Sequence, residues 1–106
     1  MIIVTTNDLP GQVIEQVIGE VFGLTVRSRN IGSQFGASLK SLVGGELKGM
    51  TTMLAQGREQ AIERLVEEAA GRGANAILAM RVDTSELGGT WTEICAYGTA
   101  VVARPA

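Results

Sequence analysis

Histidine is absent from this chain of 106 residues, and cysteine occurs once, as Cys95. Histidine is the commonest general base and the commonest metal ligand in proteins, so its absence removes the usual route to either kind of site. A lone cysteine cannot form an intramolecular disulfide, which fits a reducing cytosol. With one thiol and no imidazole, a protomer cannot supply a tetrahedral zinc site or a paired-thiolate copper site.

Aromatic residues, basic clusters and long apolar runs are also scarce. Aromatics make up 4% of the chain, so the core must be aliphatic. The nine basic residues are scattered and the net charge is −2, which argues against nucleic-acid binding by phosphate neutralisation. No apolar run approaches the ~20 residues of a membrane span, and the N-terminus lacks the basic region of a signal peptide. We therefore expect a cytoplasmic protein with no nucleic-acid and no membrane partner.

The length of the chain indicates one domain, and its glycine content indicates many turns and close backbone contacts. A chain of 106 residues fits one domain, residues 1–106, with 45% apolar residues. Its fourteen glycines are dispersed and not repetitive, which indicates turns, bulges and close backbone approach and not low complexity.

The first half of the chain predicts two strands and a short helix. Residues 2–6 are β-branched and precede a cluster of turn formers, so they predict a short strand. Residues 12–28 combine apolar alternation with interrupting glycines, which favours one long, bulged strand. Residues 35–43 carry apolar side chains at the spacing of a short amphipathic helix, with Ser33 at its N-cap.

The second half predicts one long helix and a hairpin. Residues 46–70 carry a narrow apolar stripe among charged residues, and the helix should end at the glycines of segment 71–73. Alternating apolar residues then predict strands at 76–84 and 91–104, joined by the loop 85–89.

The predicted order β-β-α-α-β-β indicates an α+β protein, a two-layer α/β sandwich with a mainly antiparallel sheet. Strict alternation places Leu78, Met80 and Val82 on one face of their strand and Ile77 on the other. In the last strand, the set of small and apolar side chains that begins with Thr92 suits close packing beneath a helix.

A series of short segments, in fixed order, carries a family resemblance that spans nearly the whole chain. They are Thr5-Thr6 with Gly11, Gly19-Glu20-Val21 with Gly23, Val43-Gly44-Gly45, Arg58 with Ala61, Gly73-Ala74-Asn75-Ala76 and Tyr97-Gly98-Thr99-Ala100-Val101. This set resembles the YbjQ-like proteins, a family of uncharacterised small domains that carries a heavy-metal-binding label.

The resemblance implies a dodecin-like protomer in a ring-shaped homo-oligomer, most simply a pentamer, and no particular activity. The metal label fits this sequence poorly, because one thiol without histidine is a meagre ligand set. In addition, Met50 stands where the family has an aromatic residue before the threonine that opens the long helix.

One face of the predicted sheet collects the candidate functional side chains. We expect six polar or reactive residues to point away from the helices: Arg27, Arg81, Asp83, Glu93, Cys95 and Tyr97. Val21, Trp91 and Val101 are expected on the same face, where they would favour burial. A face that mixes large apolar groups with charges is typical of an interface, so these residues either seal neighbouring subunits or line a ligand cavity.

Two features of this face have a functional and a structural interpretation. Cys95 from several subunits could gather at a symmetry axis as a soft-metal or redox site, or it could be a small buried apolar residue. Asp83 and Glu93 could act as an acid–base pair, although Arg81 and Arg27 nearby favour ordinary charge compensation.

Three further positions carry weaker signals. Gly44-Gly45 could cradle an anion, although a kink between two helices explains them better, since the lysine of a phosphate loop is missing. Arg58 either lies over the apolar core or pairs with a neighbouring subunit. Residues 73–76 form a helix-to-strand connection, in which Asn75 tolerates an unusual backbone conformation.

The sequence therefore favours a non-enzymatic, homo-oligomeric binding or scaffold protein that needs no cofactor. The alternative is a metal-binding or small-molecule-binding protein whose site forms only between subunits. An enzyme is the weakest hypothesis, because the chain has no nucleophile–base pair and no cofactor fingerprint.

Overall fold

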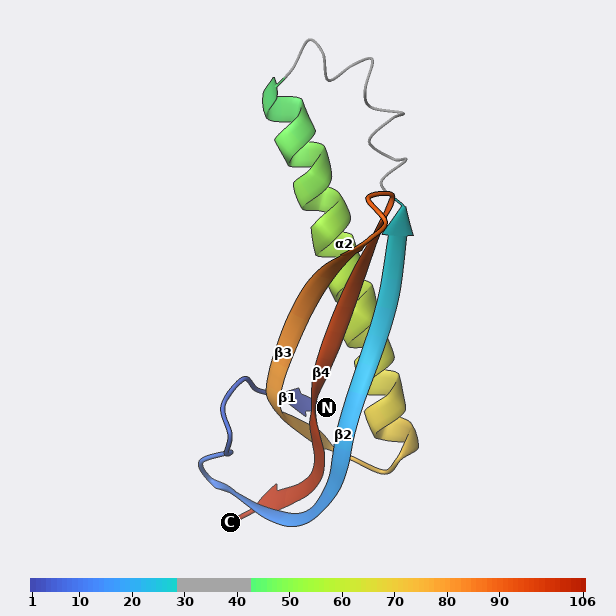
Figure 1. Ribbon diagram of the computed structural model, residues 1–106. Helices are drawn as coiled ribbons and strands as arrows, with labels where there is room; N and C mark the ends of the chain where they lie inside the picture. Colours follow the sequence, from blue (N-terminus) through green and yellow to red (C-terminus); the bar gives the residue numbers. More distant parts are fainter. Residues whose placement is uncertain (29–42) are drawn as a thin grey trace.

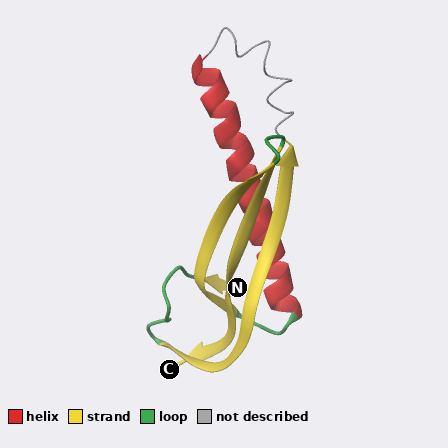
Figure 2. Cartoon of the chain, in the orientation of Figure 1, coloured by secondary structure: helices red, strands yellow, loops and turns green. Residues whose placement is uncertain are grey.

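The computed structural model describes residues 1–28 and 43–106, and in them it shows one helix packed on one sheet (Figures 1 and 2). The elements are β1 (Ile2–Ile3), β2 (Gln12–Ser28), α2 (Val43–Gly71), β3 (Ala76–Leu87) and β4 (Trp91–Pro105). The short helix expected at 35–43 falls almost wholly on residues outside the described part. The α+β, two-layer prediction is confirmed for the described residues.

The sheet is mixed, and its strands lie in the order β1-β3-β4-β2. β4 pairs antiparallel with both β2 and β3, whereas β1 pairs parallel with β3 through Ile2↔Ala76 and Ile3↔Ile77. The first two strands are therefore not neighbours, and the described order is β-β-α-β-β instead of the predicted β-β-α-α-β-β. The first strand also ends at Ile3 instead of residue 6.

Bulges decide which side chains face the helix. In β3 the register shifts between Leu78 and Arg81, and Ala79 has a left-handed backbone with φ 53°. The extra residue brings Ile77 and Met80 into the same core beneath α2, while Leu78 packs on the opposite face. The predicted strict alternation of this strand is therefore wrong, because one bulge reverses the phase. The long bulged strand at Gln12–Ser28 is confirmed, with register shifts after Ile14 and Val17.

The main core lies between α2 and the inner sheet face, which we define as the face turned toward α2. Ala61, Leu65 and Ala69 of the helix are fully buried against residues such as Val21 and Ile94. Gly23 allows this approach, because a Cβ there would overlap the carbonyl oxygen of Ala61 and the amide nitrogen of Leu65.

Two side chains expected on the outer sheet face belong to this inner one. Val21 and Arg27 lie opposite Gly98 and Thr92 in the antiparallel register, and directly opposite residues share a face. Since Gly98 and Thr92 are buried on the side of α2, Val21 and Arg27 lie there too, which corrects the sequence prediction.

A second, smaller core covers part of the outer sheet face, which we define as the face turned away from α2. Leu9, from the β1–β2 connection, packs there with Leu78 and Val101. Val101 is thus buried on the outer face, as expected. The rest of that face, toward the β3–β4 turn, has no such cover within the described residues.

Helix α2 begins at Val43, so Gly44-Gly45 lie in its first turn and do not interrupt it, contrary to the prediction of a break. It ends at Gly71, and Gly73 has a left-handed φ of 87° that completes the turn. The first turns of α2 extend beyond the β3–β4 turn (Figure 1). The molecule is accordingly elongated, 57 × 24 × 17 Å, with a radius of gyration of 17.3 Å. A compact chain of this length has a radius of gyration of ~13 Å.

Candidate functional site on the outer sheet face

The open half of the outer sheet face is an ordered grid of side chains from three strands. Register places Arg81, Tyr97 and Phe22 in one row, Asp83, Cys95 and Leu24 in the next, and Ser85, Glu93 and Val26 in the third. The column from β3 is polar and the column from β2, the edge strand, is apolar. Strand β4 between them combines a thiol, a phenol and a carboxylate.

The β2 column is unusually exposed for apolar residues. Phe22, Leu24 and Val26 retain 47%, 39% and 51% of their accessible surface. Trp91, at the β4 end of the same face, retains 47%. Scattered exposed apolar residues are common, but a contiguous column of them on one sheet face is typical of an interaction surface.

A shallow hollow of about 470 Å³ lies beside this column, over β2, β4 and β3. Three carboxylates line it, Glu20, Asp83 and Glu93, and none of them has an ion-pair partner among the described residues. Cys95 and Tyr97 lie among them. We call this group, with Phe22 and Leu24, the acidic hollow.

The acidic hollow disfavours ionisation of its thiol and phenol. Partial burial raises the pKa of Cys95 above its usual 9.0, and the negative charges of Glu93, Asp83 and Glu20 raise it further. The charge of Asp83 is the largest cause that raises the pKa of Tyr97 above 10.0, followed by partial desolvation and a hydrogen bond to Asp83. Cys95 is therefore a protonated thiol at neutral pH and a poor nucleophile.

Arg27 lies on the other side of the sheet, in a polar layer beneath α2. Its Nη2 donates to Gln60 Oε1 at 3.2 Å, and the hydroxyl of Thr25 donates to the same oxygen at 2.6 Å. The Nε of Arg27 is buried and has no hydrogen-bond partner among the described residues. Arg27 thus belongs to the helix–sheet contact and is removed from the candidate site.

Arg81 is on the outer sheet face, as predicted, but it acts within the fold. Its Nη1 donates to the carbonyl oxygens of Thr5 and Met80, at 2.9 Å each. The guanidinium therefore holds the β1–β2 connection against β3. It does not pair with Asp83 or Glu93, so the expected charge compensation of those carboxylates is not found in the described structure.

Arg58 is separated from the other candidates. It lines a groove of about 570 Å³ on the inner sheet side, between α2 and the β3–β4 pair. The groove is mainly apolar, with Leu54, Ala55 and Val82 among its lining residues. Arg58 is exposed and makes no hydrogen bond or ion pair within residues 1–28 and 43–106.

Of the seven predicted residues, four meet at one place: Asp83, Glu93, Cys95 and Tyr97. Sequence reasoning missed the β2 contribution to that place, from Glu20, Phe22 and Leu24. A signal for it was present, because Gly23 and Thr25 alternate with Phe22 and Leu24, and small residues mark the side that lies beneath a helix.

Among the described residues, no three His, Cys, Asp or Glu side chains form a group that could hold a metal ion, even though Cys95 and three carboxylates line the acidic hollow. The protomer therefore does not fit the resident heavy-metal centre that the family label suggests. Nor is the thiol of the acidic hollow an activated nucleophile, since burial and the neighbouring carboxylates keep Cys95 protonated.

Fold and site together define a small α+β protein in which, over residues 1–28 and 43–106, one helix packs on a mixed sheet and half of the outer sheet face is left open. The chain belongs to the YbjQ family, whose model, described as "Putative heavy-metal-binding", matches residues 1–104. It is 72% identical to a UPF0145 protein of Acidothermus cellulolyticus over 100 residues, 94% of this chain and 93% of the relative. A UPF0145 protein of Streptomyces coelicolor is 65% identical over 102 residues, 96% of each chain. The family resemblance is confirmed.

A solved structure supports the fold. The crystal structure of a protein of unknown function from Pediococcus pentosaceus superposes on this one with a TM-score of 0.59, and the match covers 98% of each chain. Its sequence identity is 19%, so the likeness concerns the fold alone. No helix in the part of the chain that the structure describes is long and apolar enough to cross a membrane.

Proposed function

We propose that this protein is a cytosolic, non-enzymatic binding or scaffold protein that works as a homo-oligomer, with the outer sheet face as a subunit interface. The observation that carries the proposal is the contiguous exposed β2 column, Phe22, Leu24 and Val26, beside the acidic hollow. Covering such apolar surface contributes about 25 cal/mol per Å², so a partner on this face is favoured.

The shape of the protomer supports the same proposal. Helix α2 extends beyond the sheet (Figure 1), and its apolar residues Met50 and Leu54 are 40% and 38% exposed. A long helix in water is stabilised mainly by packing of its apolar face. A neighbouring subunit supplies that packing, and a closed ring of five dodecin-like protomers is the assembly that the family resemblance implies.

The test is native mass spectrometry of the full untagged chain, together with light scattering after gel filtration. We expect a species of five times the chain mass of 11.1 kDa. A wild-type protein that stays monomeric at micromolar concentration would refute the proposal.

A substitution pair then locates the interface. Leu24→Glu should disperse the assembly, because it introduces a charge into the exposed apolar β2 column. Val13→Glu is the matched control, since Val13 is on the same strand and is 38% exposed against 39% for Leu24. Arg81→Glu is less informative, because it also breaks the bond to Thr5.

A second candidate function is binding of a metal or small molecule between subunits. The observation that favours it is the placement of Cys95 with three carboxylates in one hollow, which symmetry would repeat around a ring. Elemental analysis of the purified oligomer tests this candidate. A stoichiometric metal that is lost in Cys95→Ser would support it, and equal metal content in the two proteins would remove Cys95 as a ligand.

A further inference from the structure

Two surfaces of this chain match each other in charge and in apolar character, although they lie on opposite sides of the sheet. The acidic hollow on the outer sheet face has three carboxylates beside Phe22 and Leu24, and none of the three has an ion-pair partner among the described residues. The groove on the inner sheet side has an arginine, Arg58, that has no ion-pair partner in the part of the chain that the structure describes, and it lies beside Leu54 and Ala55. Neither surface finds its complement within the described part of its own chain.

Charge decides how two copies can meet on the acidic hollow. If two outer sheet faces packed against each other, Glu20, Asp83 and Glu93 of each copy would meet the same three carboxylates of the other. Like charges brought together in an interface cost several kcal/mol. The cation of the same face does not relieve this repulsion, because Arg81 is bonded to the carbonyl oxygens of Thr5 and Met80.

The groove offers the positive charge that the acidic hollow lacks, together with exposed apolar surface. Arg58 is an exposed guanidinium with no partner among the described residues, and its planar group can bond a carboxylate through two nitrogens. Around it, Leu54 is 38% exposed and Val82 is half-buried, so apolar surface is available to meet Phe22 and Leu24. Placing one guanidinium among three carboxylates also reduces the repulsion among those carboxylates.

We propose that the subunits join head to tail, with the α2–β3 groove of one copy docked on the acidic hollow of the next and Arg58 paired with its carboxylates. This inference rests on the proposed oligomer and names its contact. Because the two surfaces lie on opposite sides of the sheet, the contact is heterologous. Repetition of a heterologous contact generates a closed ring or an open filament, whereas a face-to-face contact stops at a dimer.

The single native cysteine makes this contact directly testable by disulfide cross-linking. Cys95 lines the acidic hollow, and Ala55 is an exposed residue of the groove one helical turn from Arg58. Within one chain the sheet separates positions 55 and 95, so an intramolecular disulfide cannot form. Between docked copies, Ala55→Cys brings a second thiol to Cys95 while Arg58 is retained.

The decisive experiment mixes wild-type chains with the double variant Ala55→Cys/Cys95→Ser, and oxidises the mixture gently. We expect a cross-linked pair joined through positions 55 and 95, identified by peptide mass spectrometry, whereas each protein alone gives little dimer. The single variant Ala55→Cys should give a ladder of linked chains. A 95–95 disulfide as the main product of wild-type protein would instead indicate face-to-face packing and overturn the head-to-tail contact.

Charge reversal provides an independent readout. Arg58→Glu and Glu93→Arg should each weaken assembly by at least about tenfold in dissociation constant, and the two changes in one chain should restore part of it. Glu67→Arg, an exposed helix position outside both surfaces, is the control. If wild type assembles but Arg58→Glu has no effect and no 55–95 link forms, this contact is refuted while the oligomer stands. If wild type is monomeric, the oligomer itself is refuted.

Discussion

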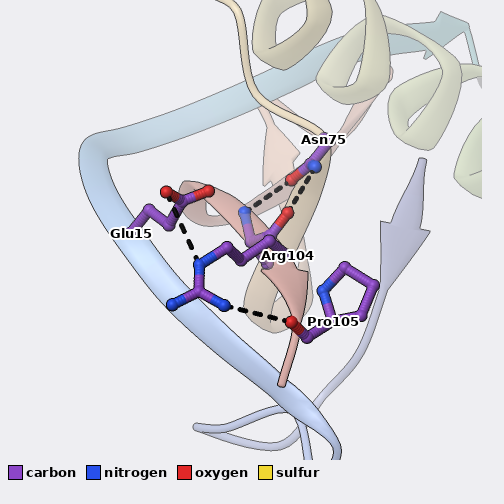
Figure 3. Close-up of polar contacts among 5 residues, drawn as sticks. Glu15, Asn75, Arg104 and Pro105 are labelled. Carbon is purple, nitrogen blue, oxygen red and sulfur yellow. Dashed lines mark hydrogen bonds and ion pairs between the residues drawn. The ribbon is translucent and has the colours of Figure 1, made fainter.

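The side chain of Asn75 and the backbone of Ala103 exchange two hydrogen bonds, so that the amide acts as a strand partner (Figure 3). Asn75 Nδ2 donates to the Ala103 carbonyl at 2.7 Å, and the Ala103 N–H donates to Asn75 Oδ1 at 2.8 Å. The backbone N–H of Asn75 also donates to the carbonyl of Val101 at 3.1 Å. The connection after α2 is therefore tied to the last strand.

We predict that Asn75→Ala lowers the free energy of unfolding by about 1–3 kcal/mol, because both bonds are lost together. Asn75→Asp should also destabilise the protein, since the carboxylate keeps the acceptor but replaces the donor that faces the Ala103 carbonyl. Denaturant unfolding measures both changes. An unchanged midpoint for Asn75→Ala would mean that water replaces these bonds at no cost.

Gly23 and Gly49 provide a matched pair of glycine substitutions with opposite expected signs. A methyl group at Gly23 would overlap the backbone of α2 at Ala61 and Leu65, so Gly23→Ala should destabilise the fold by about 1–3 kcal/mol or prevent folding. Gly49 is helical, and a methyl group there meets nothing within 4 Å. Gly49→Ala should therefore stabilise the protein by about 0.5–1 kcal/mol. Thermal unfolding of the two variants checks both signs.

Charged side chains of α2 and of Arg72, the residue that follows it, cover the free edge of β2. Arg72 donates to the carbonyls of Glu20 and Ile18 at 2.9 and 3.3 Å, Arg64 donates to that of Leu24, and Glu68 accepts from the N–H of Phe22 at 3.3 Å. Unpaired strand edges invite pairing with other chains.

We predict that the double variant Arg64→Ala/Arg72→Ala aggregates faster on mild heating, because these edge carbonyls lose their donors. Glu67→Ala is the control, since Glu67 is an exposed helix position outside these edge contacts and outside both proposed docking surfaces. Light scattering during a temperature ramp compares the proteins. Equal aggregation rates would show that the edge needs no such protection.

The raised pKa of Cys95 predicts a pH dependence of stability. Its folded pKa lies above the usual 9.0, so the folded state holds this proton more tightly than the unfolded state. The contribution to stability is complete below pH 9.0 and is lost as the pH rises toward the folded pKa. Tyr97 adds a similar loss above 10.0.

Unfolding by denaturant at a series of alkaline pH values should therefore show stability falling above pH 9.0, and falling less in Cys95→Ser. Glu93→Gln should lower the pKa of Cys95, measured by the ultraviolet absorbance of the thiolate, because Glu93 is the first of the charges that raise it. A Cys95 pKa that does not move in Glu93→Gln would contradict the placement of the two side chains in one hollow.

Local patterns in the sequence predicted most of the elements, but the phase of two strands required the structure. The small residues of β4 from Thr92 to Ala100 correctly identified the inner sheet face, since only small side chains fit beneath a closely packed helix. In β3 the phase changed at the bulge of Ala79, which no local pattern signals, because alanine rarely adopts a positive φ.

The candidate site was predicted in part for the same reason: patterns within one strand were informative, and the pairing between strands was not visible in the sequence. Cys95, Glu93 and Tyr97 were predicted together, because alternate residues of one strand share a face whatever the strand pairs with. Their neighbours Glu20 and Leu24 were missed, and Arg27 was misplaced, because the face that β2 turns outward depends on its pairing with β4. That pairing joins residues from 63 positions apart (Ser28 and Trp91) to 93 positions apart (Gln12 and Pro105), so it leaves no periodicity in the sequence.

By itself, the sequence determined the α+β class, the long helix, the family and the poverty of metal ligands, since composition and short-range periodicity act within one element. Only the tertiary structure decided that β1 pairs with β3, that Arg81 is bonded to Thr5 and that Arg58 and Cys95 lie on opposite sides of the sheet. These relationships arise from strand register and from the packing of α2, which many weak long-range contacts fix together and no single segment encodes.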